Sequence, residues 1–203
     1  MKSWCWLMPL AFVMVGCQLF SHIDVKPTRP TNPTSTAAPA RPGVIAISPA
    51  NASIAFTGST SLTSQSGHFE VFEGTLEVPT DDPKDIKIQV SVDMNSTTTK
   101  IGLLTKHLKS DDFFDVAHHP KSEFALDSIA PSNEAGRYQV SGKLTLHGVQ
   151  KPISFPARIT CMPDEVSFDA TMTIHQAEFG MIEAAKKTKD EVPVTVSIRG
   201  RRK

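Results

Sequence analysis

Apolar and polar side chains alternate along most of the chain beyond Gly43. The longest series of alternating apolar positions is Ile86, Ile88, Val90, Val92 and Met94. The polar residues between them are Lys87, Gln89, Ser91 and Asp93. A period of two predicts a strand with one buried and one solvated face. Similar rows lie at 54–56, 69–78, 124–126, 138–147, 153–159, 166–175 and 192–199. About eight strands with short Asp, Pro, Gly and Asn connections predict an all-β antiparallel meander, closed as a barrel or packed as a sandwich.

The segment KIGLLTKHLKSDDFFDVAHHP, residues 100–120, breaks this alternation. Leu104 and Leu108 are four residues apart, and the Ser-Asp-Asp run at 110–112 resembles a helix N-cap with acids in the first turn. We therefore predict two short helices that end before Pro120. As an insert between strands they would lie over the barrel opening, with Phe113 or Phe114 packed against the mouth.

The stretch GKLTLHGVQKP, residues 142–152, alternates up to His147 and then turns through Gly148. Gly148 is expected to adopt a positive φ in this tight turn. For His147 we favour a structural role, in which its ring bonds to nearby backbone.

The first residues are of a different class. Residues 1–16 combine Lys2 with a short apolar run, as in a bacterial signal peptide, and Gly16-Cys17 resembles a lipobox in which Cys17 is lipidated. Ordinary secretory cleavage nearby is the alternative. Residues 17–43 are rich in Pro and poor in large apolar side chains, which predicts an extended, disordered tether.

Charge and cysteine content narrow the function further. The chain has 21 Lys plus Arg and 21 Asp plus Glu, which argues against nucleic acid as a partner. The final RGRRK run predicts a solvated basic tail over residues 200–203. Cys161 has no partner in the mature chain, because Cys5 is removed and Cys17 modified, so the domain must rely on its hydrophobic core.

No motif for catalysis or metal binding accounts for the polar residues. The chain has no H-E-x-x-H, no G-x-S-x-G and no P-loop. The neighbouring His118 and His119 point in different directions as adjacent residues, so they do not chelate together. We therefore predict neither an enzyme nor a metal site, and no cofactor.

Four segments together resemble one family: GHFEVFEGTLEV, HLKSDDFFDVAHHP, GRYQVSGKLTLHGVQKPISFPARI and TIHQAEFGM. In this order they are similar to the YceI-like family of polyisoprenoid-binding proteins, over residues 44–199. The resemblance implies an eight-stranded antiparallel barrel of lipocalin type that holds a long apolar lipid and has no catalytic residues.

Such a barrel is wide enough to be filled by side chains or to hold one ligand. With the resemblance, a lipid tunnel is favoured, and its function would be that of a membrane-tethered, periplasm-facing carrier or sequestration protein. The implied partners are a long-chain isoprenoid or acyl lipid, the membrane through Cys17, and a second copy of the chain as an optional homodimer. The alternative is a structural or interaction lipoprotein with a filled barrel. The candidate tunnel and lid residues are Phe56, Phe69, Phe72, Leu104, Leu108, Phe113, Phe114, Phe124, Phe155 and Phe168.

Overall fold

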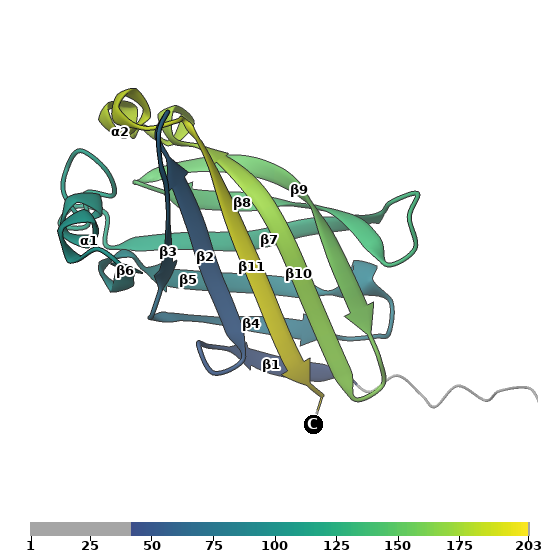
Figure 1. The fold of residues 1–203 in the computed structure, drawn as a ribbon. Helices are drawn as coiled ribbons and strands as arrows, with labels where there is room; N and C mark the ends of the chain where they lie inside the picture. Colours follow the sequence, from purple (N-terminus) through teal and green to yellow (C-terminus); the bar gives the residue numbers. More distant parts are fainter. Residues whose placement is uncertain (1–41, 203) are drawn as a thin grey trace, which may run out of the picture. The chain divides into compact units, whose positions relative to one another are not determined.

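A computed structural model describes residues 42–202, and their fold is all-β (Figure 1). The strands are β1 (Gly43–Ile47), β2 (Ala52–Ser59), β3 (Ser64–Phe69), β4 (Phe72–Val78), β5 (Lys87–Asp93), β6 (Thr97–Thr99), β7 (Lys121–Pro131), β8 (Arg137–Leu146), β9 (Val149–Cys161), β10 (Glu165–His175) and β11 (Glu191–Arg201). The helices are α1 (Gly102–Leu108) and α2 (Ile182–Lys187), with 3₁₀ turns η1 (Pro83–Asp85), η2 (Met94–Ser96) and η3 (Gln176–Phe179).

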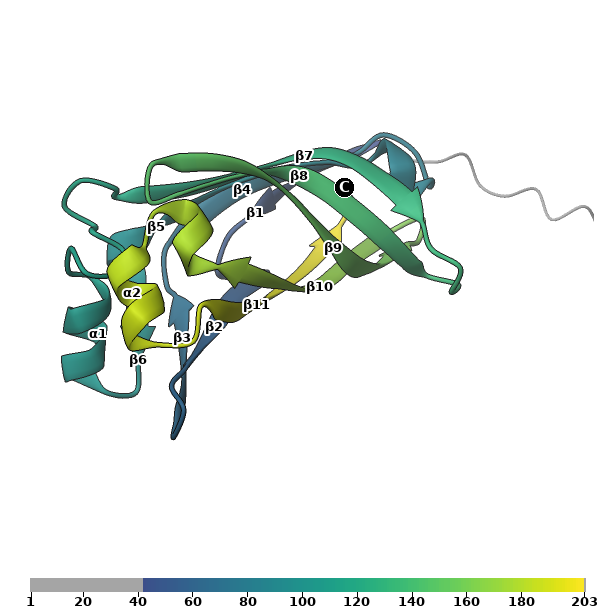
Figure 2. The ribbon, with the colours of Figure 1, turned by 90° about the horizontal axis from the view of Figure 1, so that it is seen from above.

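These strands form one antiparallel sheet in the order β1-β4-β5-β7-β8-β9-β10-β11-β2-β3-β6. The sheet closes on itself because β3 runs into β4, and β5 runs into β6 through η2. β4 pairs with β5 and β3 pairs with β6. At the bend, Glu70 N–H donates to the Ser96 carbonyl (3.2 Å) and Asp93 N–H donates to the Val71 carbonyl (3.0 Å). The result is the curled, barrel-like sheet seen from the side and from above (Figures 1 and 2).

The predicted antiparallel barrel is confirmed, with eleven strands among the described residues in place of about eight. The row at 69–78 is interrupted after Phe69 and is counted as β3 and β4. β6 consists of three threonines, which carry no apolar alternation. β1 begins at the position where the sequence predicts the tether to end.

Inward-facing side chains form two adjoining apolar clusters. The larger contains Ile45, Ile47, Phe72, Leu76, Val78, Ile86, Ile88, Ile129, Val140, Phe155, Ala157, Ile159, Val166, Phe168, Ala170 and Ile198. The second contains Met94, Phe113, Leu146, Ile174, Phe179, Met181 and Ala184, and it lies toward the end of the barrel that carries α1 and α2 (Figure 1). These helices and the adjoining turns therefore belong to one end of the barrel.

The prediction of two helices over residues 100–120 is wrong for the second one. α1 forms, but residues after Leu108 make successive turns, in which the N–H groups of Phe113 and Asp115 donate to the Ser110 carbonyl at 3.1 and 2.9 Å. Asp115 has a φ of 45°, a left-handed conformation that a right-handed helix cannot contain. Phe113 and Phe114 therefore lie in a turn segment rather than on a helix.

The predicted solvated tail at 200–203 is also wrong for its described part. β11 continues to Arg201, and Arg202 is 6% exposed. Its guanidinium pairs with the Asp81 carboxylate and donates to the Thr80 carbonyl at 3.3 Å. Nearby Cys161 is a free, partly buried thiol, and burial raises its pKa. The last strand thus helps to close the end of the barrel away from α1 and α2.

Every strand pairing described above joins residues within 43–201, so residues 42–202 contain the sheet and both clusters that the structure describes. The predicted signal peptide, Cys17 and tether lie outside the described residues. Within residues 42–202, no helix has the length and apolar character needed to cross a membrane.

Candidate functional site

The barrel encloses an apolar cavity of about 230 Å³. A single buried water needs only about 10–15 Å³ of such space, so the interior is far from filled by its own side chains. Its deep part is bordered by residues of the larger apolar cluster. These are Ile88, Phe155, Phe168 and Ile198, with Ile54 and Val196 packed against them.

The cavity is elongated along the barrel. On β11, the alternate residues Val192, Val194, Val196 and Ile198 all line it. At about 3.3 Å per residue, this stretch of strand spans roughly 20 Å. A long, narrow apolar space matches an extended hydrocarbon chain better than a compact ligand.

Three aromatic rings meet near the mouth. Phe56 on β2 lies 5.4 Å from Phe69 on β3 and 5.9 Å from Phe114, measured between ring centroids. Phe69 and Phe114 are 6.2 Å apart. These separations allow edge and tilted packing. Phe114 therefore anchors the turn segment after α1 to the barrel wall.

Nine of the ten candidate residues chosen from the sequence line the cavity. They are Phe56, Phe69, Leu104, Leu108, Phe113, Phe114, Phe124, Phe155 and Phe168. Phe72 is instead buried in the larger apolar cluster, at 4% exposure, and is not among the lining residues. The alternation predicts that the Phe72 side chain points into the barrel, but it does not show whether other side chains fill the space around it.

Polar groups at the mouth were not singled out from the sequence. Ser59, Thr60, Thr63 and Gln65 line the cavity from the β2–β3 hairpin. Gln176 is buried, and its amide donates to Thr188 Oγ1 (3.0 Å) and to the Lys189 carbonyl (2.8 Å), which ties η3 to the connection before β11. Hydroxyl and amide groups at this end can form hydrogen bonds with the polar end of a ligand whose hydrocarbon part lies deeper in the cavity.

Exposed apolar side chains surround the same end. Leu62 is 91% exposed beside lining residues Thr60 and Thr63, and Leu103 is 79% exposed beside Leu104. Ile182, 48% exposed, follows the lining residue Met181. Figure 2 shows α1, α2 and the β2–β3 hairpin at one end of the barrel. The mouth therefore has an apolar rim, defined here as Leu62, Leu103 and Ile182.

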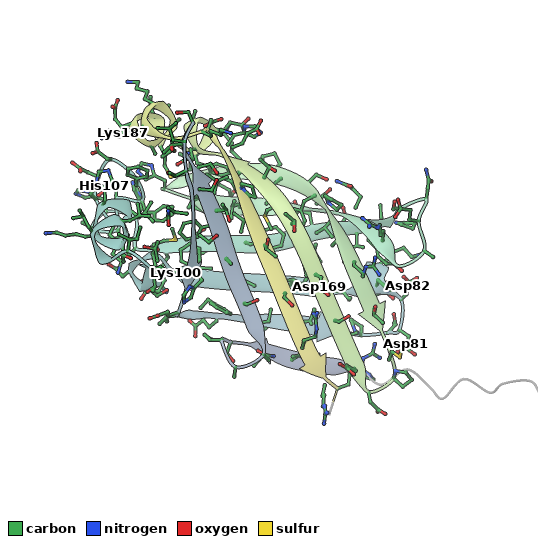
Figure 3. All side chains as sticks on the ribbon, viewed as in Figure 1. Asp81, Asp82, Lys100, His107, Asp169 and Lys187 are labelled. Carbon is green, nitrogen blue, oxygen red and sulfur yellow. The ribbon has the colours of Figure 1, made fainter. Side chains whose placement is uncertain are left out.

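An ion pair joins the two segments that cover the mouth. Lys187 of α2 donates to Asp112 Oδ2 at 2.5 Å, and Figure 3 shows Lys187 and His107 at this end. The hydrogen bond from Lys187 holds the pKa of the Asp112 carboxyl below its ordinary value. Because both side chains are well exposed, the pair contributes little to stability and can open.

The β8–β9 turn lies beside these segments. Gly148 has the expected positive φ, 73°, and His147 also has one, 51°. Burial of the His147 ring and the neighbouring His119 lower its pKa, and Asp115 and a backbone hydrogen bond to Phe179 act in the opposite direction.

Comparison with known proteins identifies similar chains. The YceI-like domain model matches residues 46–199. Protein YceI of Salmonella arizonae is 29% identical over 140 residues, which cover 66% of this chain and 72% of that one. A UPF0312 protein of Pectobacterium atrosepticum is 27% identical over the same length and shares.

Two solved structures share the fold. BcnA of Burkholderia cenocepacia superposes with a TM-score of 0.65 at 20% identity, covering 73% of this chain and 96% of that one. A polyisoprenoid-binding domain from Saccharophagus degradans gives a TM-score of 0.63 at 16% identity, covering 80% of this chain and all of that one, 100%.

Proposed function

Because this chain belongs to the YceI-like family, we propose that it is a membrane-tethered, periplasm-facing protein that carries or sequesters a long-chain polyisoprenoid or another apolar lipid. The observation that carries this proposal is the elongated apolar cavity inside the barrel. The Saccharophagus domain of the same fold is a polyisoprenoid-binding domain. We place the protein among binding proteins rather than enzymes.

Binding in such a cavity would be driven by removal of hydrocarbon from water. Each buried CH₂ contributes about 0.8 kcal/mol, so a chain of ten or so methylene equivalents offsets the entropy lost on association. The hydroxyl and amide groups at the mouth would meet the polar end of the lipid. This arrangement favours single-chain lipids with a small headgroup.

The filled-barrel alternative, a structural or interaction lipoprotein without a small-molecule ligand, is the second candidate. A cavity of about 230 Å³ lined mostly by aliphatic and aromatic residues argues against it. Protein cores are close-packed, with few voids larger than a water molecule. An unfilled interior of this size is therefore expected to serve a ligand.

Extraction with organic solvent tests whether the barrel contains a bound lipid. Residues 42–203 would be produced in a bacterial host, purified without detergent, extracted with organic solvent and analysed by mass spectrometry. We expect one long-chain lipid per barrel. If no lipid is recovered and the purified barrel takes up no added prenyl or acyl chain, the filled-barrel alternative is the better description.

Tethering rests on Gly16-Cys17 and the Pro-rich segment after it. One acyl chain binds a bilayer only marginally, whereas two or three make release negligible. The full-length chain should therefore partition into the detergent phase and accept a fatty-acid label. Cys17→Ser should abolish both, and label incorporation that survives this change would exclude Cys17 as the anchor.

A further inference from the structure

Asp115, His119 and His147 come together beside the β8–β9 turn. Each presents one potential ligand atom, and these atoms all lie within 4.8 Å of one another. The His119 and His147 rings are 4.5 Å apart between centroids. All three residues are partly exposed, and the His147 Nε2 atom itself is buried among them. The three residues are 4 and 28 positions apart along the chain, so the sequence alone does not indicate that they come together.

Two residues with left-handed backbone conformations belong to this cluster. Among residues 42–202, the non-glycine residues with positive φ are Asp115 (45°) and His147 (51°), and both belong to it. His147 and Gly148 are the two central residues of the β8–β9 hairpin, a turn that requires positive φ at both, whereas no hairpin requires the left-handed conformation of Asp115. The chain also keeps Gly148 beneath His119: a Cβ there would lie 2.7 Å from the His119 ring. The turn thus accommodates the two rings side by side.

The hydrogen bonds of His147 and Asp115 resemble those of metal-binding side chains. His147 Nε2 is buried and has no hydrogen-bond partner among the described residues. The other ring nitrogen, Nδ1, faces the backbone next to Phe179, since a Cβ at Gly180 would lie 3.5 Å from it, and a hydrogen bond from Nδ1 to this backbone leaves the Nε2 lone pair available. On the opposite side, Asp115 accepts hydrogen bonds from His118 Nδ1 at 2.9 and 3.0 Å. Metal ligands commonly have such outer partners, which fix the tautomer and orientation.

We propose that Asp115, His119 and His147 bind a divalent transition-metal ion, with zinc as the best match. Two imidazoles and one carboxylate form a ligand set that zinc accepts, with a fourth position left for water. Tetrahedral zinc ligands lie roughly 3.4 Å from one another, so the three groups would need to approach by no more than about 1.4 Å. Side-chain rotation supplies a movement of this size.

Such an ion would connect the turn segment after α1 to the β8–β9 turn. Asp115 directly follows Phe114, whose ring packs on Phe56 and Phe69 at the mouth. Metal binding would therefore fix the segment that covers the cavity. The site itself does not depend on the lipid proposal, and it would exist in a barrel of either function.

Zinc alone is the probe for this site. Residues 42–203, freed of metal with a chelator that is then removed, would be titrated with zinc by calorimetry, and bound zinc would be counted by elemental analysis. We expect one zinc per chain. Asp115→Asn and His147→Asn should each weaken binding by more than about 100-fold, beyond the usual effect of an outer partner. Asn is chosen because it tolerates positive φ.

His68→Asn is the matched control, since His68 is an exposed histidine of β3 outside the cluster. It should leave zinc affinity within about two-fold of the parent, and circular dichroism should show unchanged strand content in all variants. The proposal is overturned if the parent binds no zinc at micromolar concentration, or if both cluster variants retain its affinity. In either case the two histidines form a structural ring pair only.

Discussion

The ring of Phe56 on β2 lies directly over Gly67 of β3, its partner in the strand register. A Cβ at Gly67 would lie 2.4 Å from Cζ of Phe56, closer than packed atoms approach. The absence of a side chain at Gly67 therefore lets Phe56 lie against the wall, where it also contacts Phe69 and Phe114.

Gly67→Ala should push the Phe56 ring toward the cavity. The displaced ring would occupy space that the lipid fills, so we expect lipid affinity to fall by roughly ten-fold. The measurement is the amount of lipid retained after dilution of the loaded barrel. Gly102→Ala is the control, because a Cβ at Gly102 meets nothing within 4 Å and Gly102 does not line the cavity. Equal retention by the two variants would mean that the position of Phe56 does not limit the cavity.

Phe114→Asp should weaken lipid binding while the barrel stays folded. The change removes two aromatic contacts and places a carboxylate beside apolar rings, which costs several kcal/mol unless the side chain turns to water. We expect at least about ten-fold less retained lipid, measured by mass spectrometry, with unchanged strand content by circular dichroism.

Val71→Asp provides the comparison for Phe114→Asp, because Val71 is 57% exposed and does not line the cavity. Its lipid content should match that of the parent. Loss of lipid in both variants would point to a general effect of added charge, and retention in both would remove the covering role from Phe114.

The strands could be predicted from the sequence because one dry face per strand is a local pattern. The Val192–Ile198 row shows this most clearly, since its apolar members all face the interior. The extent of that interior could not be predicted in the same way. Phe72 and Phe124 both occupy apolar positions of an alternating segment. Phe72 is packed in the core, whereas Phe124 borders the cavity. The difference depends on what lies across the barrel.

Tertiary contacts also overrode two local signals. The Ser110–Asp112 run resembles a helix start, but Phe113 and Phe114 are drawn into the mouth and Asp115 turns left-handed, so no helix follows. The basic C-terminal run resembles a solvated tail, but Arg202 is enclosed by its pairing with Asp81. Neither outcome follows from neighbours in sequence, because the partners lie far along the chain.

Arg202→Ala should destabilise the barrel by about 2 kcal/mol, the usual scale for hydrogen bonds to a charged group. The Arg202 side chain has no exposed area, whereas its partner Asp81 is 41% exposed, so solvent moderates the loss. For a domain of this size we expect the melting temperature to fall by about 4–8 °C. Arg201→Ala is the control, since Arg201 is exposed. Equal melting temperatures for the two variants would show that the buried pair adds no net stability.

The apolar rim should matter for transfer of lipid rather than for its storage. A carrier that exchanges lipid with a bilayer must bring its mouth to the membrane surface, and Leu62 and Leu103 are exposed where that contact would form. Burying one leucine contributes about 1.5–3 kcal/mol. The double variant Leu62→Ser with Leu103→Ser should therefore transfer lipid to vesicles at least about ten-fold more slowly.

The rim and the cavity can be separated by two measurements on the same proteins. Lipid content before transfer should be unchanged in the double variant, because neither leucine lines the cavity. Val44→Ser is the control for exposed apolar area, since Val44 is 73% exposed on β1 and is not part of the rim. Its transfer rate should equal that of the parent. If Val44→Ser slows transfer as much as the double variant does, the effect comes from general surface hydrophobicity. If the double variant transfers lipid at the parent rate, the mouth does not reach the membrane through this rim.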